Sequence, residues 1–542
     1  MVAPTAALVE RRAQPTGNSP ELPRSVVDTR LPALSGRVLR AARSGDLQRA
    51  LDGARPGDQI VLSPGVTYAG NFRLRRYVGD GWVVIRPDLP ESKLPAPGSR
   101  ATPGSTSLPR IVTPNANPAL AADAGAAGYR IIGVEVGAAP SVTTAYSLVA
   151  LGEGDKSQNS LDRVPRRIIL DRVIVRGHDT LDVRRGVALN GAELAVIDSW
   201  IAGIHSKSDA AAVWGWNGPG PFRIEGNRLE GSGENIMFGG SDPRIADLVP
   251  ADIEIRRNLL TKRVSWKAAK VPVKNAFELK SGRRVLVEGN VFENVWTSGQ
   301  DGTAIVLKST NQDGRCTQCV TEYVTFQNNI VRNAASGLLI NAAETGKPGA
   351  ALPERVNHVR IHNVLFLEIG LPEWGTGGKL FRIFGGVSDV SIQHVTSTSN
   401  PRGILDARDS RDANPNLVFG YNLVERRWYG IGAGGDEGVP TLGRNFPQAV
   451  YKQNVIVNTS QSTDQAVSDS SLKAKYPPQT MIARGWEEVA FQSGTYRLSP
   501  GSPFKRAADD GRDIGIDWDA LEKAQSGAGG SGPCGRAIPR PK

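Results

Sequence analysis

One asparagine pattern recurs from Asn227 to Asn454 and limits the folds that the chain can adopt. A short run of alternating apolar residues reaches an asparagine, and a second apolar pair follows, as in FRIEGNRLEG and VLVEGNVFEN. In the longest gap of the pattern Val364 and Val395 occupy the same column, and Ser199 precedes the first asparagine. Such short strands at a regular spacing fit neither a helical repeat nor a β-sandwich. The asparagines are Asn227, Asn258, Asn290, Asn329, Asn422 and Asn454, with spacings of 31, 32, 39, 93 and 32 residues.

A parallel β-solenoid explains this repeat. In such a fold each coil lays a few short strands over the preceding coil, side chains alternate between interior and surface, and insertions leave as loops. A buried asparagine at each turn can hydrogen-bond to the asparagines above and below it, as in stacked cross-β segments. The recurring asparagines are therefore predicted to be structural rather than catalytic.

A second strand in each coil aligns as well, from GVALNG and AAVWGW through AFELKS and AIVLKS to GLLINA and LFRIFG. Large apolar residues at one position of each segment predict a stacked core. The predicted inward column is Leu189, Trp214, Phe238, Leu279, Leu307, Ile340 and Ile383. One predicted outward column is Ala188, Val213, Met237, Glu278, Val306, Leu339 and Arg382, and the next is Asn190, Gly215, Gly239, Lys280, Lys308, Asn341 and Phe384.

Two stretches bound the repeat region: LQRALDGARPGDQIVLSPGVTYAGNFRL at residues 47–74 and YRLSPGSPFKRAADDGRDIGID at residues 496–517. They resemble the helical cap with a PGD-type turn and the closing segment of right-handed parallel β-helix proteins of the pectin-lyase-like superfamily. GENIMFGGSDP and NQDG resemble a bacterial subgroup of that superfamily, from which no catalytic assignment transfers. The resemblance implies an all-β right-handed parallel β-helix of about ten to twelve coils, with an N-terminal helical cap and an irregular C-terminal segment.

The chain is predicted to form one domain. Residues 1–34 are expected to be a disordered lead-in, residues 35–520 the β-helix, and residues 521–542 a flexible tail of Gly-rich composition. No stretch approaches twenty apolar residues, so no membrane span is predicted. The protein is expected to be a monomer that is secreted, periplasmic or on the cell surface, its signal peptide not being present in the printed chain.

The charge balance favours an acidic partner. There are 65 basic and 54 acidic residues, giving a formal net charge of +11. A basic surface suits a polyanion, although a general compositional bias of the proteome is an equal explanation. Because the arginines are spread without a dense block, no nucleic-acid motif emerges, and an acidic polysaccharide is the predicted partner.

Metal ligands are sparse in this sequence. Cys316 and Cys319 in RCTQC lack a second pair at zinc-ribbon spacing, so a local disulfide or two free thiols is predicted rather than a zinc site. Cys534 lies in the predicted tail. Five histidines without an HxH or HExxH pair argue against a transition-metal site, whereas Ca²⁺ held by carboxylates is possible without being defined by any spacing.

Three charged residues are predicted to form the catalytic group. Glu278 and Lys280 lie two residues apart, so in a strand their side chains share one face. The outward columns bring Lys308 next to Lys280, one coil away at about 4.8 Å. Two stacked ammonium groups favour an anionic ligand, and their repulsion makes one of them easier to deprotonate. The alternative is a surface ion pair.

Other coils and loops add residues to the same face. Trp216, in a Gly- and Pro-rich loop, could stack on a sugar ring, and covering the edge of the core is an equal alternative. The predicted substrate-binding residues are Arg382, Arg185, Asn341, Trp216, His205 and Asp301.

Three functions remain open at this point. A polysaccharide lyase would use Lys280 and Lys308 as base and carboxylate clamp for β-elimination from a uronate. A glycoside hydrolase would pair Glu278 with Asp301 or Asp242. A non-catalytic solenoid would bind glycan or assemble on a cell surface. The lyase is preferred because it alone uses both the lysine pair and the basic charge.

Overall fold

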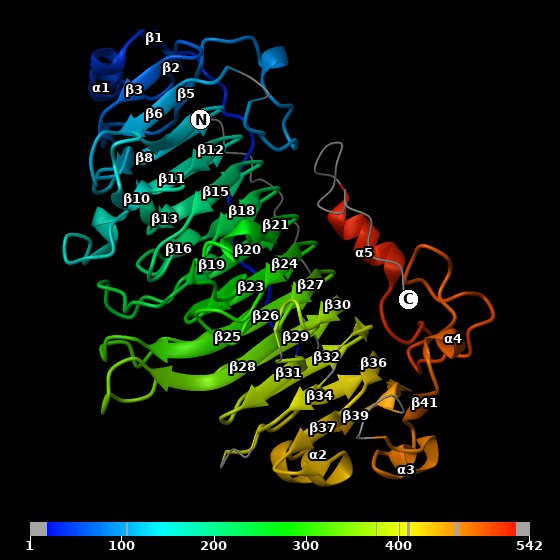
Figure 1. The fold of residues 1–542 in the computed structure, drawn as a ribbon. Coiled ribbons are helices and arrows are strands. Elements are labelled where there is room, and N and C mark those ends of the chain that lie inside the picture. The colour runs from blue at the N-terminus through cyan, green and yellow to red at the C-terminus, as the bar shows by residue number, and fades with distance from the viewer. Residues whose placement is uncertain are drawn as a thin grey trace, which may run out of the picture.

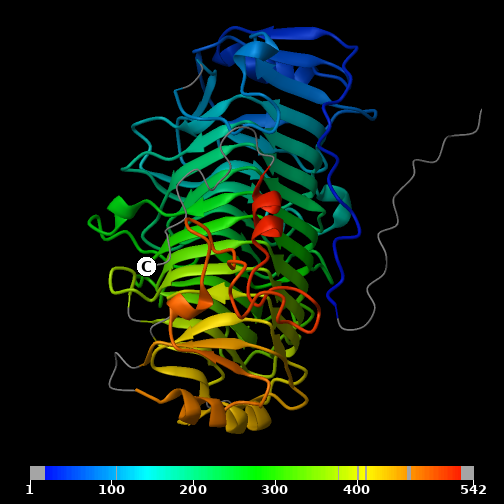
Figure 2. The ribbon, with the colours of Figure 1, turned by 90° about the vertical axis from the view of Figure 1, so that its right-hand side faces the viewer.

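Three long parallel sheets wind around a single core. The computed structural model describes residues 19–526, except 105–106, 376, 400–401, 409–411 and 461–465. Each coil contributes one strand to sheet A, one to sheet B and one to sheet C in turn, which produces the stacked rows of arrows in Figures 1 and 2. Twelve coils, from β2–β4 to β35–β37, are complete within the described residues. The predicted all-β parallel β-helix is confirmed.

Sheet A holds β1 (Val38–Ala41), β2 (Gln59–Leu62), β5 (Val83–Pro87), β8 (Ala127–Ile132), β11 (Arg166–Asp171), β14 (Ala192–Ile197), β17 (Phe222–Glu225), β20 (Ala251–Arg256), β23 (Gly282–Glu288), β26 (Thr321–Gln327), β29 (Asn357–His362), β32 (Ser388–Gln393), β35 (Val418–Gly420) and β39 (Val450–Tyr451).

Sheet B holds β3 (Thr67–Ala69), β6 (Arg110–Thr113), β9 (Glu135–Ala138), β12 (Ile174–Arg176), β15 (Trp200–Ile204), β18 (Arg228–Gly231), β21 (Leu259–Thr261), β24 (Val291–Val295), β27 (Ile330–Ala334), β30 (Leu365–Ile369), β33 (Thr396–Ser397), β36 (Leu423–Arg426), β40 (Val455–Asn458) and β41 (Met481–Ala483).

Sheet C holds β4 (Phe72–Leu74), β7 (Leu120–Ala122), β10 (Thr144–Leu151), β13 (Asp182–Leu189), β16 (Ala211–Gly215), β19 (Glu234–Phe238), β22 (Phe277–Leu279), β25 (Thr303–Asn311), β28 (Ser336–Thr345), β31 (Lys379–Phe384), β34 (Gly403–Asp406), β37 (Tyr429–Ala433) and the antiparallel β38 (Asp436–Glu437).

Helices close the ends of the solenoid. The amphipathic α1 (Ser44–Gly53) buries Leu47 and Leu51 against the first coil and caps the apolar core there. Towards the other end lie α2 (Val439–Asn445) and α3 (Asp469–Ala474), and the closing segment carries α4 (Trp486–Val489) and α5 (Trp518–Gln525). Short 3-10 turns occur at Glu91–Lys93, Leu161–Arg163 and Val264–Trp266.

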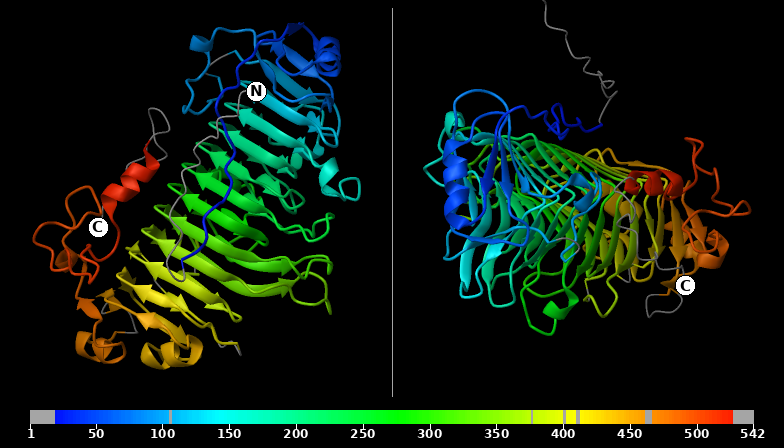
Figure 3. Two further views of the ribbon diagram at one scale, coloured as in Figure 1. Left: turned by 180° about the vertical axis from the view of Figure 1, so that it is seen from behind. Right: turned by 90° about the horizontal axis from the view of Figure 1, so that it is seen from above.

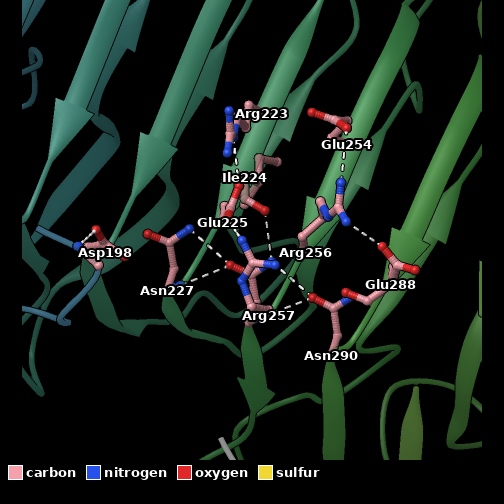
Figure 4. Close-up of polar contacts among 12 residues, drawn as sticks. Asp198, Arg223, Ile224, Glu225, Asn227, Glu254, Arg256, Arg257, Glu288 and Asn290 are labelled. Atoms are coloured by element: carbon pink, nitrogen blue, oxygen red, sulfur yellow. Dashed lines mark hydrogen bonds and ion pairs between the residues drawn. The ribbon is translucent and has the colours of Figure 1, made fainter. Parts of the chain in front are cut away.

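Fully buried asparagines occupy the turn between sheets A and B. The Nδ2 of Asn227 donates to Oδ1 of Asn258 at 2.9 Å, and Asn258 donates in the same way to Asn290 at 3.0 Å. Each Oδ1 also accepts the backbone N–H of the asparagine in the preceding coil, as at Asn227 and Asn258. Figure 4 shows Asn227 and Asn290 at these turns. The stack continues to Asn329, and Asn422 and Asn454 repeat the arrangement further along.

The predicted core column of sheet C is wrong at Trp214. The register pairs Trp214 with Ala188 and Met237, which places its indole on the outer face, while Gly215 pairs with the buried Phe238. A Cβ on Gly215 would lie only 2.4 Å from the carbonyl oxygen of Leu189. The inward position therefore takes a glycine, and the two tryptophans on either side of it point outward.

The two ends of the chain cover the outer faces of sheets A and B. Residues 19–34 run along sheet A as the dark-blue segment in Figure 3, where Val27 packs against Ile169 and Ala195. Residues 481–526 return over sheet B, and α5 buries Trp518 against its apolar outer side chains (Figure 2). Residues 19–34 thus pack on the solenoid instead of forming part of a disordered lead-in. Residues 1–18 and 527–542, with Cys534, lie outside the described residues.

The asparagine stack yields a test of the fold. Asn258→Leu should lower the free energy of unfolding by about 1–3 kcal/mol, because Asn227 and Asn290 each lose a buried hydrogen-bond partner. Asn159→Leu, at an exposed loop position, should change it by less than about 0.5 kcal/mol. Denaturant titrations measure both changes, and equal stability of the two variants would contradict a structural role for the stack.

Candidate functional site

The outer face of sheet C carries a large pocket of about 850 Å³. Its floor consists of Ala121, Ala150 and Ala188, which are neighbours across three successive coils of one outward column. The next residue in that column is Trp214, which lines the pocket together with Trp216. Small side chains in three coils followed by a large ring in the fourth create the hollow and one of its walls.

Arg185 of β13 is buried in this pocket among aromatic rings. Its guanidinium carbon lies 4.0 Å from the ring centroid of Trp214, 4.1 Å from that of Tyr146 and 4.5 Å from that of Trp216. The side chain is only 2% exposed, yet Nε and Nη1 find no hydrogen-bond partner among the described residues. Burial lowers the pKa of Arg185 to about 10. A buried cation with free donors is an anion-binding group by its chemistry.

The rest of the pocket lining is also charged. Four arginines, one of which is Arg185, and three acidic residues line the pocket, and most of them already interact with other polar or charged groups of the protein. Arg73 pairs with Asp123 at 2.8 Å, whereas Arg184 lies 3.7 Å from Asp209. Burial raises the pKa of Glu153. With four arginines against three acidic residues the lining is basic, and Arg185 is the arginine that lies among aromatic rings.

Lys308 lies between two carboxylates. Its Nζ is 3.0 Å from Oε1 of the buried Glu278 and 2.9 Å from Oε1 of Glu344. Although burial opposes it, the two carboxylates raise the pKa of Lys308 to about 12. Burial alone would raise the pKa of Glu278, but Lys280 and Lys308 hold it below the usual range. Lys308 is therefore held in its protonated form, because Glu344, one coil further, supplies a second negative partner.

Lys280 is placed differently. Its Nζ lies 3.5 Å from Oε1 of Gln312, and its side chain passes the edge of the pocket, where a Cβ on Gly240 would lie 3.5 Å from Lys280 Cδ. Lys308 therefore pairs with Glu278 while Lys280 lies beside Gln312, and a catalytic role for these three residues stays a prediction.

The other predicted residues divide into those inside and those outside the pocket. Arg185 and Trp216 line it. Arg382 is three coils beyond Glu278, with Nη2 2.6 Å from Asp301 Oδ2, and the two neutralise each other.

Three further residues lie apart from the pocket. Asn341 stands one coil beyond Lys308 in the same column. His205 packs edge-on to Trp266, with ring centroids 6.1 Å apart. Asp242 accepts the backbone N–H groups of Gln312, Asp313 and Arg315, so it holds a loop.

Tyr146 and Glu234 were missed by the sequence reasoning. Tyr146 comes from a coil without the asparagine motif, and only the three stacked alanines could have revealed the pocket that it borders. Glu234 of β19 is 2% exposed, and its Oε2 has no partner in the described part of the chain. Burial, reinforced by the hydrogen-bonded carboxylate of Glu278, raises the pKa of Glu234 to about 8.

The comparisons with known proteins concern the fold. No protein-family model matches the sequence, and no curated protein sequence matches it. Among solved structures, a PL6 family alginate lyase matches with 12% identity and a TM-score of 0.52, over 89% of this chain and 56% of that one. A mannuronic acid specific polysaccharide family 6 lyase from human gut microbiota matches with 10% identity and a TM-score of 0.50, over 82% and 91% of the two chains.

These neighbours are right-handed β-helices. The chain has the right-handed parallel β-helix fold. The β-helix fold predicted from the terminal segments is thereby confirmed. This chain spans only about half the length of the alginate lyase. At such low identity the likeness does not assign an activity to the β-helix.

Metal and membrane features complete the description. No group of three or more His, Cys, Asp or Glu side chains in the described residues is arranged to hold a metal ion. Cys316 and Cys319 form a disulfide, so neither sulfur is a thiolate. Among the residues described, no helix has both the length and the apolar content to cross a bilayer.

The buried Glu234 makes a prediction about pH. Its pKa rises from an ordinary 4.5 to about 8 on folding, so the native state must keep a proton that the unfolded chain releases. Keeping this proton lowers the free energy of unfolding. The loss is absent below pH 4.5, increases up to about pH 8 and is constant above that pH. The melting temperature of Glu234→Gln should therefore increase relative to that of the wild type as the pH increases from 5 to 9. Glu487→Gln, on exposed α4, should show no such trend, and parallel profiles for all three proteins would contradict the prediction.

Proposed function

We propose that this β-helix binds an acidic polysaccharide in the pocket on sheet C and cleaves it by β-elimination. The observation that carries the proposal is the guanidinium of Arg185, which is buried, surrounded by three aromatic rings and short of hydrogen-bond acceptors among the described residues. An uncompensated buried cation is costly for folding. A carboxylate on the substrate would supply the missing charge and acceptors.

The geometry suits a uronate. A planar guanidinium binds a carboxylate through two parallel N–H···O bonds, so Arg185 would fix both the position and the orientation of that group. The half-exposed ring of Tyr146 would contact the apolar face of a sugar ring. Neutralising the carboxylate stabilises the negative charge that develops when the α-carbon loses its proton. β-Elimination needs this stabilisation.

Three further observations support this function. The two neighbours described above, with TM-scores of 0.52 and 0.50, are an alginate lyase and a mannuronic acid specific polysaccharide lyase. The net charge of +11 favours a polyanionic partner. The Cys316–Cys319 disulfide is typical of a protein outside the reducing cytoplasm, where polysaccharides are found.

Glycoside hydrolysis fits less well. It needs two carboxyl groups that reach the scissile bond from opposite sides. Glu278 is 1% exposed and ion-paired, Asp242 is fully buried and holds a loop, and Asp301 pairs with Arg382. Each carboxylate considered for that reaction therefore already has a partner within the protein.

Arg185 provides the test. Arg185→Gln should weaken binding of alginate or polygalacturonate at least about tenfold, and Arg185→Lys should weaken it less, because charge remains but the planar fork is lost. Isothermal titration measures the affinities, and absorbance of the new unsaturated uronate bond measures cleavage. Dextran serves as the neutral polysaccharide.

The matched control is Arg228→Gln. Arg228 also stacks on a tryptophan, at 4.8 Å from the Trp200 ring, but on sheet B. This variant should bind acidic polysaccharide as the wild type does. Equal binding by Arg185→Gln and the wild type, or binding of dextran as strong as that of the uronates, would refute the proposed function.

A further inference from the structure

Tyr146 is an aromatic residue whose exposure has no structural explanation. It lies on β10 directly before Ser147, which pairs with Arg185 of the next coil. Its side chain is 51% exposed and lines the pocket, whereas the aromatic residues of the solenoid core are buried. A half-exposed ring contributes little to the stability of the coil. Its position is therefore better explained by contact with a ligand.

Two arginines flank this tyrosine. The guanidinium carbon of Arg185 lies 4.1 Å from the ring centroid and that of Arg184 lies 5.4 Å from it. The phenol ring of Tyr146 is thus held against the group that would bind the substrate carboxylate. The carbon that loses its proton in β-elimination is bonded directly to that carboxylate.

The other proton carriers in the pocket are differently placed. Asp155 accepts from the backbone N–H and the hydroxyl of Ser157. Asp209 is ion-paired with Lys274. Glu153 lines the same pocket, and its charged neighbours are Arg73 and Asp155.

The lysines give no better alternative. Lys308 is fixed between Glu278 and Glu344, and Lys280 reaches the pocket with its aliphatic stem while its Nζ lies near Gln312. Of the proton carriers that line the pocket, Tyr146 is therefore the one in contact with Arg185.

We propose that Tyr146 is the catalytic proton-transfer residue of the β-elimination, an inference that rests on the proposed function of this pocket. Its phenolate oxygen takes the proton from the carbon next to the carboxylate. The electron pair of that C–H bond forms a double bond to the neighbouring ring carbon, and the bond from this carbon to the glycosidic oxygen breaks. The phenol then returns the proton to that oxygen, so the tyrosine is regenerated and no further reactant is required.

Tyr146→Phe tests this role with minimal change, since it removes the hydroxyl and keeps the ring over Arg185. Turnover of alginate or polygalacturonate, followed by product absorbance, should fall at least about 100-fold. Binding measured by titration should stay close to that of the wild type. The pH dependence of the residual rate should also differ from that of the wild type, because the group that takes the proton is no longer present.

Two controls accompany that variant. Tyr323→Phe, on sheet A with its ring 4.9 Å from His358, should leave binding and turnover unchanged. Glu153→Gln tests the rival proton carrier in the same pocket. Full turnover in Tyr146→Phe, or a large loss in Glu153→Gln without one in Tyr146→Phe, would overturn the assignment while leaving the lyase function intact.

The remaining outcomes are also decisive. If Tyr146→Phe loses binding together with turnover, the hydroxyl has a binding role and the assignment fails. If the wild type binds the uronates but forms no unsaturated product, the lyase reaction fails, and the assignment fails with it. Loss of turnover with retained binding and a changed pH profile is the result that supports Tyr146.

Discussion

The backbone hydrogen bonds between successive coils determine everything on the surface of this protein. They hold neighbouring coils at about 4.8 Å, so a residue's side-chain neighbours are those at the same position one coil away. The shape of the pocket is consequently the sequence of one column, in which Ala121, Ala150 and Ala188 are followed by Trp214. The apolar core and the asparagine stack fix that register from inside. A shift of one residue in any coil would exchange inner and outer side chains and remove the pocket.

Arg185 differs from the buried arginines that have a carboxylate partner. On sheet A, Arg130 lies 2.7 Å from Asp171, and Arg223 lies 2.6 Å from Glu225 within the network of Figure 4. Burying a cation without a carboxylate costs several kcal/mol, by order of magnitude, and stacking on aromatic rings returns only part of it. A buried guanidinium that lies among aromatic rings, with two nitrogens lacking an acceptor in the described residues, is an argument for a ligand.

The repeat predicted the fold because its period is imposed by the coil itself. The asparagine column and most of the core column of sheet C follow directly from it. The prediction failed at Trp214, where Gly215 occupies the inward position and leaves no apolar side chain to mark it. The site was only partly predictable, since Arg185 and Trp216 were found but Tyr146 was not. The charge state of Lys308 depends on Glu344, which a register irregularity in β28 brings opposite Thr310, and no alignment of segments could show this.

The outer faces of the three sheets differ in what covers them, and this difference determines where the pocket lies. Sheet A carries paired charges and the segment that includes Val27, and sheet B is covered by the closing segment with α5, as Figures 2 and 3 show from two sides. Sheet C has neither cover over the coils from β7 to β16, where its outer column is made of alanine and tryptophan. A long polymer can reach a solenoid only along an uncovered face. Residues 19–34 and 484–526, which bury apolar residues of sheets A and B, would therefore restrict the proposed polysaccharide binding to sheet C.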